Sequence, residues 1–224
     1  MRRVHSLICQ RRQLLLKASG SDDQPLMVGL ASEQPNGDFC VRVKTDLLKL
    51  GRELKRPLTL VELDPVVLPS KRDFAGVLML GQGQAVPDPK DKALANWARE
   101  QDIAFLGLGT GFYAALESFA ENVLCLKSDL FLPAELFRTA KRPVFNVAYQ
   151  GPFIEHGWQI LSDSEEEHLA LLLAYRGAHY YRVFYDLPFA DDQTELAKCQ
   201  SLWHDCLIDF IKAMAGTVTD WQVS

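Results

Sequence analysis

Short apolar runs alternate with amphipathic stretches along the first half of the chain, which predicts alternating strands and helices. Strands are predicted over residues 25–31, 58–63, 74–80 and 103–108. The last of these runs is apolar throughout, which is typical of a parallel strand covered on both faces. Apolar residues at helical spacing predict helices over residues 39–54, over residues 92–101 after a proline-rich loop, and from Phe112 to about Val123.

Beyond Pro133 the pattern indicates a more antiparallel region. Strands are predicted over residues 143–148, 157–161, 168–174 and 180–185, and the acidic run 162–167 is interpreted as a hairpin turn or exposed loop. A long helix closes the chain, with an apolar stripe at Leu196, Cys199, Trp203, Cys206, Leu207 and Phe210. The whole pattern predicts a three-layer α/β sandwich with a mostly parallel central sheet and an antiparallel C-terminal hairpin region.

Composition fits a single globular domain and excludes several functions. The chain has 224 residues, 48% of them hydrophobic, and a formal net charge of -5, so we expect neither disorder nor nucleic-acid binding. No apolar run approaches the ~20 residues that span a bilayer. Five cysteines without a CxxC pair favour reduced thiols and a cytoplasmic location. We interpret residues 1–24 as a basic N-terminal extension and residues 25–224 as the domain.

The turns after the strands are the places to look for chemistry, because open α/β sheets bind ligands beyond the carboxyl ends of their strands. Residues 93–124, ALANWAREQDIAFLGLGTGFYAALESFAENVL, resemble the nucleophile region of the glutaminase domain of CTP synthase, a class I glutamine amidotransferase, where a strand leads into GICLGMQ. Residues 76–83 are similar to the GILVPGGF segment of that family, and residues 169–189 to its final hairpin before HPEF. The resemblance spans about residues 25–215 and implies a flavodoxin-like fold.

The resemblance also implies that the catalytic residues have been lost. In the family a cysteine attacks the glutamine carboxamide, a histidine acts as general base, and a glutamate orients the histidine. Here Gly109 stands at the cysteine position, Asp186 at the histidine and Pro188 at the glutamate. An oxyanion hole made by backbone N–H groups would survive these changes, around Gln82 and Thr110.

The leading hypothesis is therefore a binding module for a small anionic or amide ligand, or for a protein partner, without glutaminase activity. Its expected ligand contacts are Gly81, Gln82, Gly83, Gly109, Thr110 and Gly111. The alternative is an active hydrolase or transferase that uses Thr110 and Asp186, with Tyr113 or Tyr185 assisting. A regulatory partner of a separate enzyme is a third interpretation. No cofactor is expected, and the histidines lack metal-ligand spacing, so no metal site is predicted.

Overall fold

The computed structural model describes residues 24–32, 34–63, 74–81, 88–120, 131–132, 144–145, 157–164, 169–184 and 193–216. Its helices are α2 (Asp38–Glu53), α3 (Pro89–Glu100), α4 (Thr110–Ala120) and α6 (Gln193–Met214). Its strands are β1 (Leu26–Ser32), β2 (Leu58–Glu62), β3 (Gly76–Leu80), β4 (Ala104–Leu108), β5 (Phe131–Leu132), β6 (Val144–Phe145), β7 (Trp158–Ser164), β8 (Leu169–Tyr175) and β9 (Tyr181–Phe184).

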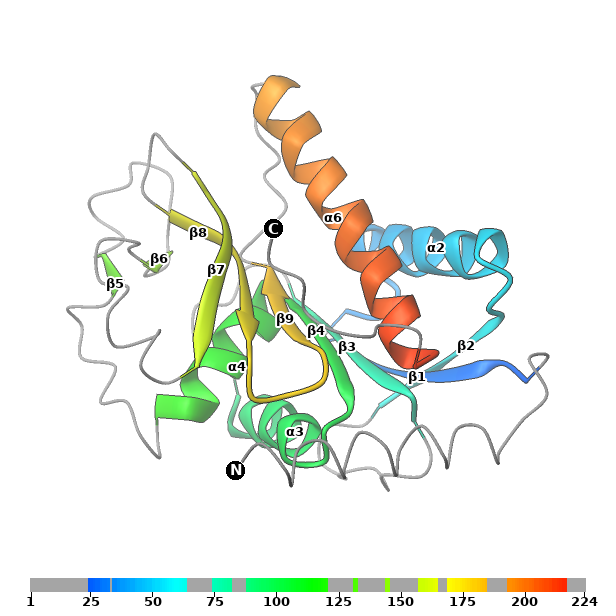
Figure 1. Cartoon of the computed structure of the whole chain (residues 1–224), viewed down its shortest axis with the longest axis horizontal. Coiled ribbons are helices and arrows are strands. Elements are labelled where there is room, and N and C mark those ends of the chain that lie inside the picture. The colour runs from blue at the N-terminus through cyan, green and yellow to red at the C-terminus, as the bar shows by residue number, and fades with distance from the viewer. Residues whose placement is uncertain are drawn as a thin grey trace.

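Seven of these strands form one sheet in the order β2-β1-β3-β4-β9-β8-β7 (Figure 1). The pairs from β2 to β9 are parallel, whereas β8 runs antiparallel to β9 and β7 antiparallel to β8. The predicted fold class is thus confirmed. One detail differs, because β9, which we assigned to the antiparallel region, also pairs in parallel with β4 through Phe105 and Tyr181. The hairpin therefore extends the parallel sheet directly.

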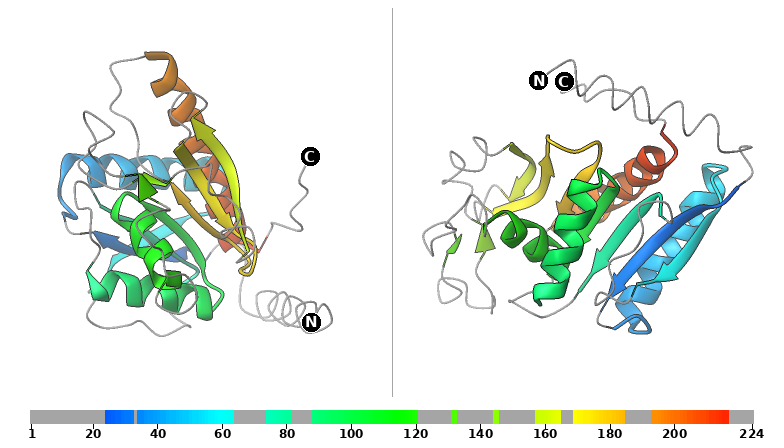
Figure 2. Two further views of the ribbon diagram at one scale, coloured as in Figure 1. Left: turned by 90° about the vertical axis from the view of Figure 1, so that its left-hand side faces the viewer. Right: turned by 90° about the horizontal axis from the view of Figure 1, so that it is seen from below.

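The described helices cover both faces of the sheet, which gives the predicted three layers (Figures 1 and 2). On one face α2 and α6 bury a core around Leu47, Leu78 and Phe210. On the other face α3 and α4 bury a second core around Phe105, Phe112 and Tyr181. Strands β3 and β4 are buried along their whole length, as the continuous apolar runs predicted.

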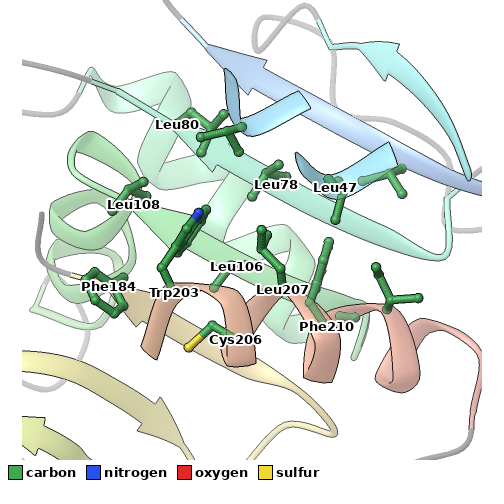
Figure 3. Packing of buried hydrophobic residues seen from close by; sticks show 14 of the residues in the cluster. Leu47, Leu78, Leu80, Leu106, Leu108, Phe184, Trp203, Cys206, Leu207 and Phe210 are labelled. Carbon is green, nitrogen blue, oxygen red and sulfur yellow. The ribbon is translucent and has the colours of Figure 1, made fainter. Parts of the chain in front are cut away.

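The α6 stripe packs as its spacing indicated. Trp203, Cys206, Leu207 and Phe210 are buried, and Figure 3 shows Leu207 and Phe210 projecting from α6 toward Leu78 and Leu47. The side chains of Leu196 and Cys199 lie outside the described residues.

Helix α3 begins three residues before the predicted start at Lys92. Asp88 is the N-cap and accepts a hydrogen bond from the Lys90 N–H at 3.0 Å, while the Asp91 carboxylate accepts from the Asp88 N–H at 3.3 Å. Pro89 occupies the first helical turn, where its missing N–H costs no hydrogen bond. The prolines that we interpreted as loop thus lead directly into a capped helix.

Strand β7 also exceeds its predicted range. It continues to Ser164, so Ser162, Asp163 and Ser164 belong to the strand and not to a turn or loop, and the interpretation of the acidic run was wrong for these three residues. The register shifts between Ile160 and Asp163 explain this, because an irregular strand does not keep the strict alternation by which strands are predicted.

Candidate functional site

A sharp turn joins β4 to α4 at Gly109. The Gly109 N–H donates to the Phe184 carbonyl oxygen at 3.3 Å, and the Gly109 carbonyl oxygen accepts from the N–H groups of Phe112 at 2.9 Å and Tyr113 at 3.3 Å. Its φ of 60° lies in the left-handed region that favours glycine. A strand that turns sharply into a helix in this way has the form called a nucleophile elbow, and Gly109 lies at the tip of this turn.

The glycines on either side of the elbow are required by a close approach of α4 to the sheet. A Cβ atom at Gly107 would stand 2.7 Å from the Gly111 carbonyl oxygen, and one at Gly111 would stand 2.5 Å from the Met79 carbonyl oxygen. Both neighbours are backbone atoms, which do not move aside cheaply. The first turn of α4 therefore lies directly on β3 and β4, and the sequence Gly-Leu-Gly-Thr-Gly follows from that contact.

Gly81, the residue after β3, closes the elbow from the other side. A Cβ atom at Gly109 would stand 2.0 Å from the Gly81 carbonyl oxygen, and the Gly81 N–H donates to the Leu108 carbonyl oxygen at 3.2 Å. The direction that a side chain at position 109 would take is thus filled by main chain. With this backbone, the elbow has no room for a nucleophile that projects from residue 109.

Thr110 lies beside this contact, at the first residue of α4. It is 3% exposed, and its Oγ1 has no hydrogen-bond partner among the described residues. A Cβ atom at Gly81 would stand 2.1 Å from that oxygen and 2.4 Å from the Thr110 Cβ, so the two residues are in tight contact. An unpartnered buried hydroxyl costs about 1 to 3 kcal/mol, which makes this oxygen a candidate ligand contact.

Trp203 carries a second unpartnered polar atom that sequence reasoning missed. Its side chain is 5% exposed, and its indole Nε1 is buried without a hydrogen-bond partner in the described part of the chain. In Figure 3 this nitrogen points from α6 toward Leu80 and Leu108, the last residues of β3 and β4. We had assigned Trp203 to an apolar stripe, and the signal overlooked was that indole brings a donor into that stripe.

The structure brings Gly81, Gly109, Thr110 and Gly111 together at the carboxyl end of the sheet, and their role in ligand binding stays a prediction. Tyr113, which the alternative hypothesis placed in the site, is 1% exposed and packs in the α3/α4 core, its ring centroid 5.4 Å from that of Phe112. The other proposed site residues lie outside the described residues: Gln82, Gly83, Tyr185, Asp186 and Pro188.

Several titratable side chains have shifted pKa values because they are buried. Desolvation raises the pKa of Cys206 to about 11 and raises those of Tyr180 and Tyr181 as well. These three groups belong to the cores, where Tyr180 and Tyr181 donate to the carbonyl oxygens of Cys206 and Ala95. Desolvation also raises the pKa of Asp91, at the start of α3.

The described residues contain no group of three or more His, Cys, Asp or Glu side chains arranged to hold a metal ion. His204 and Asp205, side by side on α6, are both largely exposed. A search of the described helices for a segment long and apolar enough to cross a membrane finds none.

No protein-family model matches the sequence, and a search of curated proteins finds no match to it. Among solved structures, the chain is similar to the glutaminase domain of Trypanosoma brucei CTP synthase (CTPS) with bound acivicin, with a TM-score of 0.63. The two are 13% identical, and the match covers 88% of this chain and 96% of that one. At this identity the likeness concerns the fold alone. The chain has the α/β fold of the class I glutamine amidotransferases.

Proposed function

We propose that this chain is a degenerate relative of the CTP synthase glutaminase domain, which binds a small anionic or amide ligand at the elbow and does not hydrolyse glutamine. The observation that carries the proposal is the contact between Gly81 and Gly109. A covalent mechanism needs a nucleophilic side chain at the elbow, whereas the Gly81 carbonyl oxygen fills the space that such a side chain would use.

Thr110 does not serve as a substitute nucleophile in this proposal. A hydroxyl becomes nucleophilic only when a base within hydrogen-bond distance takes its proton. Thr110 Oγ1 is buried, and no described residue accepts a hydrogen bond from it. Within the described residues the arrangement supports ligand binding, and Asp186, the base that the hydrolase or transferase alternative names, lies outside them.

The chemistry of the ligand follows from the groups at the elbow. Helix α4 begins there, and a helix N-terminus favours negative charge and acceptor oxygens. The Thr110 hydroxyl can donate or accept one further hydrogen bond. A carboxylate or a primary amide satisfies both groups, which makes a small carboxylic acid or amide the expected ligand.

A ligand is also favoured over a docked protein. The large hydrophobic side chains that stand exposed in the described part of the chain are Met27, 36% exposed, and Val41, 48% exposed. They lie on different elements, β1 and α2, and single exposed apolar residues are ordinary on protein surfaces.

The test is a thermal-shift and activity screen of the full chain with L-glutamine, L-glutamate and inorganic phosphate. A ligand at 100 times its Kd stabilises the folded state by about 2.7 kcal/mol, and we expect this stabilisation without release of ammonia. Thr110→Val is the matched variant, because it keeps the shape and removes the hydroxyl. It should raise the Tm of the ligand-free protein and abolish the response to ligand. Hydrolysis of glutamine by the wild type, lost in Thr110→Val, would contradict the proposal and support the hydrolase.

A further inference from the structure

We infer that Trp203 is a second ligand-contacting residue of this site, and that its indole N–H donates to a carboxylate or carbonyl oxygen of the ligand. The inference rests on the proposed function, since it concerns the ligand that binds at the elbow.

The packing of α6 places Trp203 level with the elbow. Gly76, at the amino end of β3, is in contact with Met214, because a Cβ atom there would stand 2.5 Å from the Met214 Sδ. From Met214 back to Trp203, the helix rises about 16 Å at 1.5 Å per residue. From Gly76 to Gly81, the strand advances about the same distance at roughly 3.3 Å per residue. Trp203 therefore lies beside the carboxyl ends of β3 and β4, as Figure 3 shows.

The surroundings of the indole nitrogen are apolar. Trp203 belongs to the same buried cluster as Leu80 and Leu108, and its ring packs edge-to-face on Phe184 with 5.9 Å between the ring centroids. These side chains hold the indole in place but offer no acceptor. A buried donor left in this state is destabilising, and it becomes favourable when an acceptor oxygen reaches it.

Tyr180, a buried polar side chain of the same core, does find a partner within the protein. Its hydroxyl donates to the Cys206 carbonyl oxygen at 2.9 Å, deeper along α6. Thr110 instead lies just after β4 and against Gly81, which follows β3, and Figure 3 shows Trp203 beside the same strand ends. This kind of sheet binds ligands at that edge. A ligand that reached this edge could pair with both atoms, which have no hydrogen-bond partner among the described residues.

The Trp203 indole N–H restricts which chemical groups the ligand can place against it. An indole N–H only donates, so it requires an acceptor, and a cationic group placed against it would be repelled. The elbow supplies the N–H donors of the α4 N-terminus and the Thr110 hydroxyl, which can either donate or accept a hydrogen bond. A ligand with two acceptor groups, such as a small dicarboxylate or an acid that also carries an amide, would satisfy both positions.

The experiment follows the tryptophan indole N–H signals of the ¹⁵N-labelled full chain by NMR while L-glutamine, L-glutamate or inorganic phosphate is added. The Trp203 signal is identified by its loss in Trp203→Phe. We expect it to shift on saturation with a carboxylate or amide ligand, while the signal of Trp158, buried in the opposite core, stays in place. Trp203→Phe should weaken binding about fivefold to tenfold, the effect of one lost hydrogen bond. Trp158→Phe, the matched control, should leave the Kd unchanged.

A second substitution separates the hydrogen bond from the packing. 3-Benzothienylalanine at position 203 keeps the two fused rings and lacks the N–H, so it should weaken binding as much as Trp203→Phe does. One outcome would overturn this inference and leave the proposed function standing. In that outcome the ligand binds the wild type and both position-203 variants with the same affinity, and binds Thr110→Val more weakly. A response to phosphate alone would overturn the assignment of a carboxylate or carbonyl oxygen. Absence of any binding to the wild type would overturn the proposed function and this inference together.

Discussion

The carbonyl oxygen of Gly81 lies 2.0 Å from the point at which a Cβ atom at Gly109 would stand. Any side chain at position 109 therefore has to displace the main chain that follows β3, in addition to adopting a φ of 60°. This contact determines the effect of placing a cysteine at position 109.

We predict that Gly109→Cys lowers the free energy of unfolding by at least about 2 kcal/mol and confers no glutaminase activity. Gly109→Ala is the control, and it should be equally destabilising because the cost arises from the Cβ atom and not from the thiol. Chemical denaturation and an ammonia-release assay measure the two effects. A Gly109→Cys protein as stable as the wild type would mean that the elbow is open in solution.

Gly81 and Thr110 form a second close pair, which a double-mutant cycle can measure. Gly81→Ala should destabilise the protein, because its Cβ atom would stand 2.4 Å from the Thr110 Cβ. Thr110→Gly should relieve that clash, so the double variant should be about 1 to 3 kcal/mol more stable than the sum of the single effects predicts. Additive single effects, measured by urea unfolding, would contradict the contact.

Asp91 gives the stability of the protein a pH dependence of known sign. Desolvation, opposed by the hydrogen bond from the Asp88 N–H, raises its folded-state pKa above the ordinary 3.8. The folded protein therefore binds this proton more tightly than the unfolded chain does, and the contribution of Asp91 to stability falls as the pH rises above 3.8. Asp91→Asn cannot ionise and keeps an oxygen for the cap. Its Tm relative to the wild type should rise with pH over that range, and a constant difference would contradict the assignment.

Cys206 should be inert in the folded protein. Its side chain is buried, and desolvation raises the pKa of its thiol from 9.0 to about 11. At pH 8 we expect iodoacetamide to leave Cys206 unmodified until the protein is unfolded in guanidinium chloride, because the thiolate is the reactive form. Peptide mass spectrometry after timed labelling measures this. The raised pKa also means that the contribution of Cys206 to stability is lost as the pH rises from 9 toward 11.

The layers of the fold were predictable because the buried parallel strands are continuous apolar runs and the helices are amphipathic. The pairing of β9 with both β4 and β8 was not, since strand order depends on contacts between distant segments. The start of α3 was predictable from Asp88, Pro89 and Asp91, which form a capped first turn, but the prolines were interpreted as loop.

Part of the candidate site could likewise be predicted from the sequence, and part could not. The elbow could be predicted from its glycines and from the resemblance, because the conformation of a turn depends on the few residues that form it. The close approach of the Gly81 carbonyl oxygen to Gly109 could not be predicted from the sequence. It brings together the ends of two strands and depends on main-chain geometry. The Trp203 donor was also hidden, since a tryptophan at helical spacing in an apolar stripe is equally consistent with simple core packing.

The place of β9 in the sheet affects how the protein is made. Strand β4 pairs with β3 along one edge. Its other edge pairs with β9, which is synthesised roughly seventy residues later. At about 5 to 20 residues per second, the ribosome leaves that edge open for several seconds. During this time the apolar residues Phe105 and Leu108 stand on an unfinished sheet, where another chain can pair with them. The newly made protein is therefore open to aggregation at this edge of β4 until β9 has been synthesised.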